Sequence, residues 1–223
     1  MKIIARARSD FKEKFGIPRQ SGLVPQTRAR IVVEPEYRNP DALRGIDGYS
    51  HLWLIWSFSK AEREGWSPTV RPPRLGGNTR MGVFATRSPF RPNAIGLSCV
   101  TLEEMHLHTP EGPVLVVGGA DLLDGTPIYD IKPYLPHIDS HPEARGGFAA
   151  EKADYALKVD FPEALLETID ADKREAILGV LAGDPRPSYQ HDPARVYGVR
   201  YAHYNVKFTV ADGTLTVCDV EEL

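Results

Sequence analysis

Hydrophobic residues recur in short runs along the first two thirds of the chain, either unbroken or alternating with polar residues. This pattern is typical of β-strands. One run, at 51–58, is apolar almost throughout, as in a strand that is buried on both faces. The predicted strands are residues 3–8, 30–34, 51–58, 80–86, 94–107 and 114–121. Because loops rather than long helices separate these strands, the pattern favours a closed barrel or a sandwich over a doubly wound sheet.

The loops between these strands are rich in proline and glycine. Two of them, 66–78 and 87–93, also carry arginines, whereas a third predicted loop, 124–139, carries none. Only residues 39–44 have a helical pattern in this part of the chain, with Asn39 or Asp41 available as the N-cap.

The pattern changes near residue 150. Leucine and isoleucine residues recur at helical spacing from 162 to 181. Two alternating runs follow, at 196–210 and 214–220, and the turn residues Ala211-Asp212-Gly213 join them. These features predict a small α+β unit after the strand-rich part.

The pattern therefore predicts a mainly β protein, with a closed β-barrel or a sandwich as the domain over residues 1–148 and a small α+β domain over 149–223. The chain has 223 residues, of which 42% are hydrophobic and 26% charged, as in a soluble globular protein. It has no charged-then-apolar leader and no apolar run near 18 residues, so neither secretion nor membrane insertion is expected. Two cysteines are too few for a disulfide framework, and we expect a cytoplasmic protein.

The motifs of the commonest cofactor enzymes are absent. No G-x-G-x-x-G follows a predicted strand, and neither a G-x-x-x-x-G-K-[ST] loop nor a G-x-S-x-G elbow occurs. His106 and His108 alternate on one predicted strand, and His137 and His141 share a loop. Neither pair has an acidic or cysteine partner at ligand spacing, so we expect no metal site.

Charge is distributed unevenly along the chain. The net charge is −3, but residues 1–150 hold 19 basic and 16 acidic residues, and residues 151–223 hold 8 and 14. The stretch 65–102 has no acidic residue and no lysine, yet it contains the arginines Arg71, Arg74, Arg80, Arg87 and Arg91. Guanidinium groups bind phosphate and carboxylate well, so these arginines either bind an anionic partner or pair with acids elsewhere in the fold.

Three polar loops each adjoin an apolar strand and are candidates for one site at the mouth of a barrel. The first places Arg19 and Gln20 between a proline and a glycine. The second presents Arg87 on a backbone stiffened by two prolines, and the third places Asp121 and Asp124 at the end of a strand. Any one of these loops alone also reads as an ordinary turn.

Long stretches of the first 140 residues closely resemble the TrmO family of S-adenosylmethionine-dependent tRNA methyltransferases. The stretches that carry the resemblance are PRQSGL at 18–23, ALRGI at 42–46, SHLW at 50–53, VRPPRLGGN at 70–78, GVFATRSPFRPNAIGL at 82–97 and DLLDGTPIYDIKPYLP at 121–136. The tail, at 184–189 and 204–206, also resembles the bacterial members.

This resemblance implies a homodimeric β-barrel that uses S-adenosylmethionine outside the Rossmann class. It also implies that the substrate is tRNA, methylated at N6 of the threonylcarbamoyladenosine that follows the anticodon. The cofactor contacts that it implies are Pro18, Arg19, Gln20, Phe58, Ser59, Arg87, Leu97, Asp121, Leu122, Leu123 and Asp124. Family members often have a histidine where this chain has Ser59, so a contact there involves the backbone or water.

The chemistry of the substrate suggests further candidates. The arginines Arg71, Arg74, Arg80 and Arg91 suit a tRNA backbone, and the loop aromatics Trp66 and Phe90 suit stacking on an extruded base. The acceptor N–H must also lose a proton. The candidate proton acceptors are His51, Asp124, Asp130 and Tyr134, each of which also has an ordinary structural role open to it.

Two other kinds of function fit the same residues. One is an RNA-binding module without catalysis, in which the arginines bind RNA and the cofactor pocket is vestigial. The other is an enzyme of the same barrel that acts on another acceptor, such as an acidic metabolite. Cofactor binding separates the first alternative from a methyltransferase, and the salt dependence of tRNA binding separates the second.

Overall fold

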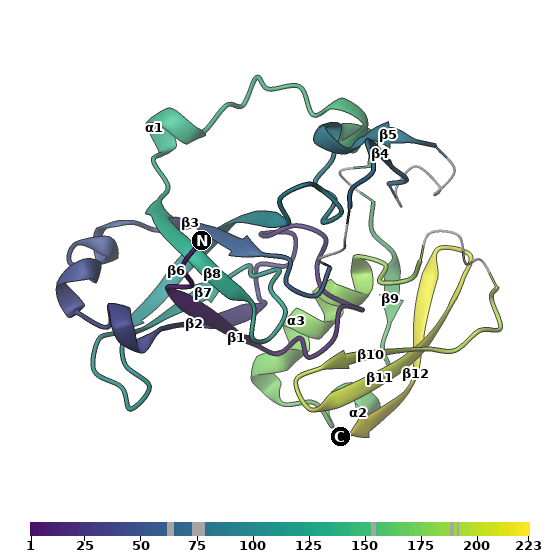
Figure 1. Cartoon of the computed structure of the whole chain (residues 1–223). Coiled ribbons are helices and arrows are strands. Elements are labelled where there is room, and N and C mark those ends of the chain that lie inside the picture. The colour runs from purple at the N-terminus through teal and green to yellow at the C-terminus, as the bar shows by residue number, and fades with distance from the viewer. Residues whose placement is uncertain (62–64, 73–78, 153–154, 188–189, 191) are drawn as a thin grey trace.

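Six antiparallel strands close into a barrel in the order β1-β2-β7-β6-β3-β8 (Figure 1). The computed structural model describes residues 1–61, 65–72, 79–152, 155–187, 190 and 192–223. The barrel strands are β1 (Ala5–Ser9), β2 (Arg28–Val33), β3 (His51–Ser57), β6 (Ile95–His106), β7 (Val114–Gly118) and β8 (Pro127–Pro133). Closure comes from β8 pairing with β1, where Ile128 lies opposite Ala5. The predicted closed barrel is confirmed.

Alternating burial along the strands fills the barrel. On β3, Leu52 and Leu54 are fully buried and Trp56 is 7% exposed, whereas His51 faces outward. The indole of Trp56 lies flat against β6 at Gly96, where a Cβ atom would overlap the ring. A residue without a side chain is therefore required at this position for Trp56 to enter the barrel.

The predicted loop at 124–139 was wrong, because it contains β8. Its prolines made this segment resemble a loop. Pro127 and Pro133 stand at the two ends of the strand, where the missing N–H removes no hydrogen bond from the interior of the sheet. The predicted strand at 80–86 was mostly wrong as well. Only β5 (Met81–Gly82) is extended there, paired with β4 (Thr69–Val70), and a single 3-10 turn, η5 (Val83–Ala85), follows it.

Short helical turns occur in the connections that follow β2 and β8. They are η1 (Pro35–Tyr37), η2 (Pro40–Leu43) and η3 (Ile46–Gly48), followed later by α1 (Pro136–Asp139) and η6 (Gly147–Lys152). The helical pattern predicted at 39–44 is the 3-10 helix η2. Asn39 is its cap, since its side chain accepts a hydrogen bond of 3.1 Å from the backbone N–H of Asp41.

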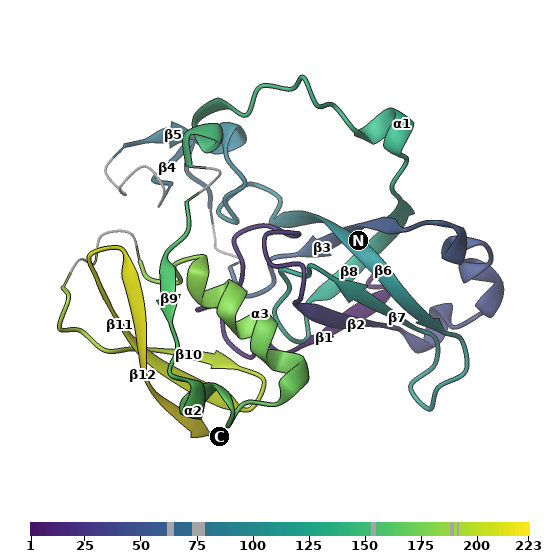
Figure 2. The same ribbon diagram turned by 180° about the vertical axis from the view of Figure 1, so that it is seen from behind.

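The C-terminal part is the predicted α+β unit. Its sheet has the order β10-β11-β12-β9, with β9 parallel to β12. The elements are β9 (Lys158–Asp160), α2 (Glu163–Leu166), α3 (Ala171–Ala182), β10 (Tyr197–Tyr201), β11 (Tyr204–Ala211) and β12 (Thr214–Glu222). Helix α3 lies between this sheet and the barrel (Figures 1 and 2). In the part of the chain that the structure describes, no helix is long and apolar enough to cross a membrane.

Two predicted elements are each divided in the structure. The helical pattern at 162–181 forms α2 and α3, and Asp170 is the N-cap of α3. The alternating run at 196–210 is a hairpin of β10 and β11. The hairpin turns at Ala202, a non-glycine residue with φ of +54°, so the alternation continues through a turn that carries no glycine.

The segment between β1 and β2 leaves the barrel and packs against the C-terminal unit. Phe11 is 1% exposed in the core of that unit, and its ring meets Tyr201 edge-on at 5.2 Å. Asp10 accepts a hydrogen bond of 2.8 Å from Ala202 N–H through its carbonyl, and its carboxylate pairs with Lys173 at 2.8 Å. The domain boundary predicted at 148/149 stays a prediction. The segment between β1 and β2 belongs to the first domain in sequence but packs into the core of the C-terminal unit.

The contact of Gly96 with Trp56 predicts a specific sensitivity of the barrel. Replacing Gly96 with alanine forces the indole away from β6, and overpacking of this kind costs about 1–3 kcal/mol. Urea unfolding of Gly96→Ala measures this loss. The control is Gly48→Ala, because a Cβ at Gly48 meets no atom within 4 Å. Equal stability of the two variants would contradict the packing argument.

Candidate functional site

A buried chain of hydrogen bonds leads from the barrel interior to Asp121. The indole Nε1–H of Trp56 donates to Ser98 Oγ at 2.9 Å, and the Ser98 hydroxyl donates to Asp121 Oδ1 at 2.6 Å. Ser98 is fully buried on β6 and Asp121 follows β7, so two neighbouring strands position the carboxylate. The direction of each hydrogen bond is fixed, because the indole N–H can only donate. The Ser98 hydroxyl therefore accepts from Trp56 and donates to Asp121.

Burial raises the pKa of Asp121 above its ordinary value, since desolvation disfavours the carboxylate anion. The Ser98 hydroxyl, the backbone N–H of Ser21 and the nearby positive charge of Arg87 oppose this effect without cancelling it. Asp121 is therefore a partly buried carboxylate that an added cation or hydroxyl donor would stabilise. Perturbed acids of this kind concentrate at functional sites.

The segment 18–22 returns to the barrel beside Asp121. Ser21 Oγ accepts a hydrogen bond of 3.1 Å from the backbone N–H of Cys99, and Gly22 N–H donates to the Gly119 carbonyl at 2.9 Å. The Arg87 guanidinium donates to Gln20 Oε1. The structure thus brings together the three loops that were predicted from the sequence, at Gln20, Arg87 and Asp121.

Two apolar candidates adjoin this cluster. The ring of Phe58 lies 4.2 Å from that of Trp56, and its backbone N–H donates to Ala94 O at 2.9 Å. Ser59 follows Phe58 and is exposed. Leu97 precedes Ser98 on β6 and is 53% exposed on the outer face of the barrel.

The remaining candidates near Asp121 lie in the loop that it begins. Leu122 is fully buried in the barrel core, so only its backbone faces the loop. The carbonyl of Leu123 accepts a hydrogen bond of 3.1 Å from Thr126 N–H. Asp124 accepts a 3.1 Å hydrogen bond from Ser9 N–H and pairs with Lys12 at 3.1 Å, so its carboxylate holds the start of the 10–27 segment.

The other predicted proton acceptors, His51, Asp130 and Tyr134, come from β3, from β8 and from the residue after β8. His51 begins β3, seven residues before Phe58, with its Nδ1 2.9 Å from Ser50 Oγ and its ring 6.0 Å from that of Tyr134. Asp130 lies on β8 opposite Ile55 and pairs with Lys132 at 3.3 Å. None of these three side chains shares a hydrogen bond or ion pair with Asp121 among the described residues.

An open cavity of about 560 Å³ lies at the Phe58 end of β3. It is lined by Met1, Ser57, Ala61, Gly65, Trp66, Ser67, Pro89, Phe90, Arg91, Pro92, Asn93, Ala94, Ile95 and Tyr129. Trp66 and Phe90 are 55% and 40% exposed, and Arg91 is the charged residue among those named. A hollow with exposed aromatic rings and a guanidinium fits a planar, anionic ligand.

The arginines of the 65–102 stretch form no ion pair with a carboxylate among the described residues. Arg80 donates to the hydroxyl of Thr69 at 3.0 Å, and Arg91 donates to the carbonyl of Thr86 at 3.0 Å. Arg71 is exposed, and Arg74 lies outside the described residues. The described arginines thus retain charge for an anionic partner, which argues against pairing with acids elsewhere in the fold.

Sequence reasoning missed the residues that support Asp121. Trp56 and Ser98 carry no motif signal, because a serine on an apolar strand looks like any buried small residue. Ser21 lies within the stretch PRQSGL but was not singled out. Tyr129 lines the cavity from a segment that was predicted as a loop. Within the described residues, no three histidine, cysteine, aspartate or glutamate side chains are grouped as metal ligands.

Comparison with known proteins identifies the family. The model of the tRNA-methyltransferase O N-terminal domain matches residues 6–140, and that of the TrmO C-terminal domain matches residues 154–223. The chain is 43% identical over 222 residues to the tRNA (adenine(37)-N6)-methyltransferase of Escherichia coli K12, covering 96% of this chain and 94% of that protein. It is also 43% identical over 205 residues to the putative S-adenosylmethionine-dependent methyltransferase RcsF of Pseudomonas aeruginosa, covering 88% and 86%.

The solved structures give the same result. The crystal structure of TrmO from Pseudomonas aeruginosa superposes with a TM-score of 0.78 at 35% sequence identity, covering 98% of this chain and 97% of that one. Both the barrel and the α+β unit are therefore shared. The chain belongs to the tRNA-methyltransferase O (TrmO) family and is a methyltransferase.

Proposed function

We propose that this enzyme transfers the methyl group of S-adenosylmethionine to N6 of threonylcarbamoyladenosine at position 37 of tRNA. The observation that carries the proposal is the convergence of Gln20, Arg87 and Asp121 beside an arginine-rich surface that has no carboxylate partners among the described residues. A half-buried acid, a guanidinium and apolar side chains suit a ligand with an ammonium, a carboxylate and an adenine. The names of the relatives in Escherichia coli and Pseudomonas aeruginosa support both the cofactor and the tRNA position.

Different residues of this cluster bind different parts of the cofactor. Asp121 accepts hydrogen bonds from the ammonium or ribose hydroxyls, and Arg87 pairs with the carboxylate. Phe58 and Leu97 supply apolar surface, while Pro18, Arg19, Gln20 and Ser59 form the rim together with the backbone of 122–124. When bound, S-adenosylmethionine supplies an electrophilic methyl group, and the protein contributes orientation and exclusion of water.

The cavity at the end of β3 receives the acceptor nucleoside. Trp66 and Phe90 are exposed enough to stack on a base that has left the anticodon loop. The threonyl carboxylate of the modified base is an anion, and Arg91 lines the same cavity. Arg71, Arg74 and Arg80 bind phosphates of the anticodon stem.

The proton of the acceptor N–H leaves through one of His51, Asp124, Asp130 or Tyr134. Asp124 is the member of this set nearest Asp121 along the chain, and its carboxylate pairs with Lys12 at 3.1 Å. The His51 and Tyr134 rings lie 6.0 Å apart, and among the described residues neither side chain shares a hydrogen bond with Asp121. We propose a homodimer, as the resemblance to the family implies, in which a second subunit brings these two side chains to the cofactor. This enzyme acts in the cytoplasm, where tRNA is found.

Methyl transfer to tRNA with and without threonylcarbamoylation tests this function directly. With labelled S-adenosylmethionine, we expect label only on tRNA that carries the modified adenosine. Label on both tRNAs would show that the enzyme does not require the threonylcarbamoyl group on its substrate. Cofactor binding without any transfer would reopen the acceptor, and the absence of cofactor binding would favour an RNA-binding module.

Asp121→Asn is predicted to weaken cofactor binding while stabilising the fold at neutral pH. Burial raises the pKa of Asp121 above its ordinary value, so the native state loses stability as rising pH ionises this carboxyl. Asparagine cannot ionise, so the gain of the variant over the unsubstituted protein grows as the pH rises through the range in which Asp121 ionises. Urea unfolding measures the gain, and titration calorimetry should show S-adenosylmethionine binding weakened at least about tenfold.

Asp139→Asn is the matched control, and its sign is opposite. The backbone N–H of Leu135 and the indole of Trp53 lower the pKa of Asp139, so its charged form adds stability above the unfolded value. Removing that charge should lower stability at pH 7 and leave cofactor binding unchanged. If Asp121→Asn kept its cofactor affinity but lost turnover, Asp121 would be a proton acceptor and no cofactor ligand.

Arg71 and Arg80 together should contribute to the salt dependence of tRNA binding. Each phosphate contact adds about one unit to the slope of log affinity against log salt. We expect Arg71→Gln/Arg80→Gln to reduce this slope by about two, as measured by filter binding over a salt series. Arg30→Gln is the control, because Arg30 already pairs with Glu111 at 2.6 Å. An unchanged slope in the double variant would remove these arginines from the tRNA surface.

A further inference from the structure

The loop that carries Pro18, Arg19 and Gln20 is attached at both ends to different parts of the molecule. On one side, Gly16 packs against the C-terminal unit, where an added Cβ would lie 3.0 Å from Val199. On the other side, Gly22 hydrogen-bonds to the end of β7. Between these points the loop has no regular secondary structure, so individual side-chain contacts determine its conformation.

One of these contacts joins Arg19 to the C-terminal unit. The Arg19 guanidinium donates through Nη2 to the backbone carbonyl of Asp184 at 3.2 Å. Asp184 comes two residues after α3, and its own N–H donates to Leu181 O at 3.1 Å. Its φ of +53° is left-handed, a conformation that non-glycine residues adopt only when their surroundings impose it. The direction of this carbonyl is therefore fixed by the groups around Asp184.

The Asp184 side chain is held by three strong hydrogen bonds. Arg186 donates from Nε at 2.9 Å to one carboxylate oxygen and from Nη2 at 3.0 Å to the other, and the Tyr155 hydroxyl donates at 2.9 Å. Both members of the ion pair are nearly buried, with side chains 11% and 12% exposed. Despite burial, these partners keep the pKa of Asp184 below its ordinary value, so the pair is charged.

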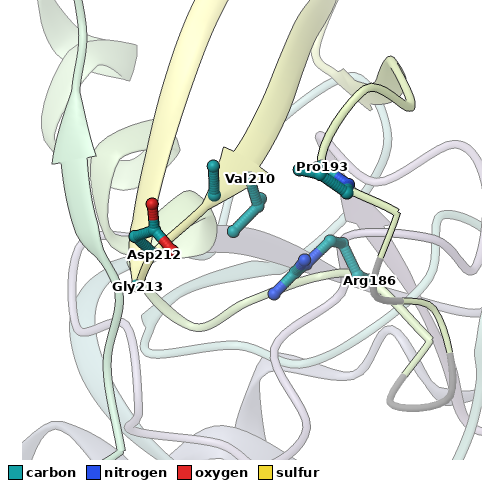
Figure 3. A pocket seen from close by; sticks show the side chains of 6 residues that line it. Arg186, Pro193, Val210, Asp212 and Gly213 are labelled. Carbon is teal, nitrogen blue, oxygen red and sulfur yellow. The ribbon is translucent and has the colours of Figure 1, made fainter.

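A buried ion pair adds little net stability, because desolvation offsets most of the attraction, but it fixes geometry. Arg186 also lines a cavity of about 360 Å³ opposite the β11–β12 turn at Asp212 and Gly213 (Figure 3). Open space on that side means that tight packing alone does not hold the guanidinium. The two-pronged contact with Asp184 is what orders Arg186 and, through the backbone of Asp184, the acceptor for Arg19.

We propose that Asp184 is a positioning residue for the cofactor: locked by Arg186 and Tyr155, it turns its carbonyl toward Arg19 and so holds the 18–20 loop in its binding conformation. The C-terminal unit thereby prepares the cofactor site of the barrel. This inference rests on the proposed role of residues 18–20 in binding S-adenosylmethionine.

The test is Asp184→Asn in the full chain. Asparagine tolerates the left-handed conformation but cannot form the charged two-pronged pair with Arg186. By titration calorimetry, we expect its dissociation constant for S-adenosylmethionine to rise about tenfold. At saturating cofactor, turnover on modified tRNA should stay within about twofold of the unsubstituted enzyme, because Asp184 touches no reacting atom.

Two controls separate positioning from general loosening. Asp219→Asn removes a carboxylate that pairs with Lys207 at 3.1 Å elsewhere in the same unit, and its affinity should not change. Val206→Ala weakens the C-terminal core at a fully buried site and supplies a variant of reduced melting temperature. If Val206→Ala lost as much affinity as Asp184→Asn at the same melting temperature, the inference would be overturned.

Unchanged affinity in folded Asp184→Asn would also overturn it. If that variant does not fold, Tyr155→Phe removes one hydrogen bond from the same carboxylate and should raise the dissociation constant about threefold, whereas no change would again count against the inference. Failure of the unsubstituted chain to bind S-adenosylmethionine is a different result, which overturns the proposed function itself.

Discussion

The packing of Phe11 in the C-terminal core constrains the rest of the molecule. This residue lies only two positions after β1 of the barrel, yet it is 1% exposed among the side chains of the other unit. The chain must therefore cross between two cores and return to β2, and the crossing segment carries the polar residues that converge on Asp121. Because both ends of this segment are anchored in cores, the site is assembled by folding of the whole chain.

Asp121 lowers the stability of the fold, so its place in this cluster is explained by binding and not by folding. A carboxylate placed beside the barrel core loses hydration, and the hydrogen bond from Ser98 only partly restores it. An apolar residue at this position would cost the fold less. The hydrogen bonds from Trp56 to Ser98 and from Ser98 to Asp121 hold the carboxylate in place. A ligand that donates hydrogen bonds to this poorly hydrated carboxylate is bound more strongly than it would be at an exposed one.

Alternation in the strands predicted a barrel or a sandwich, and the resemblance to the TrmO family selected the barrel. The convergence of Gln20, Arg87 and Asp121 could be predicted from the position of their loops beside those strands. Other features had no signal in the sequence. Strand β8 was missed because Pro127 and Pro133 are tolerated at strand ends, and the hairpin at Ala202 because a left-handed alanine looks like strand. The contact from Arg19 to Asp184 joins residues 165 positions apart, which no local pattern can indicate.

The charge of the C-terminal unit bears on how the two ligands are held. With 8 basic and 14 acidic residues after position 150, this unit repels a phosphate backbone, whereas the 65–102 stretch of the barrel attracts it. In the proposed function, long-range charge directs the tRNA to the arginine surface, and salt weakens this attraction. The segment that carries residues 18–20 is instead held by the buried ring of Phe11 and by the Arg19 hydrogen bond to Asp184, whose own ion pair is nearly buried and is therefore screened little by salt. Cofactor binding should thus persist at ionic strengths that release the tRNA.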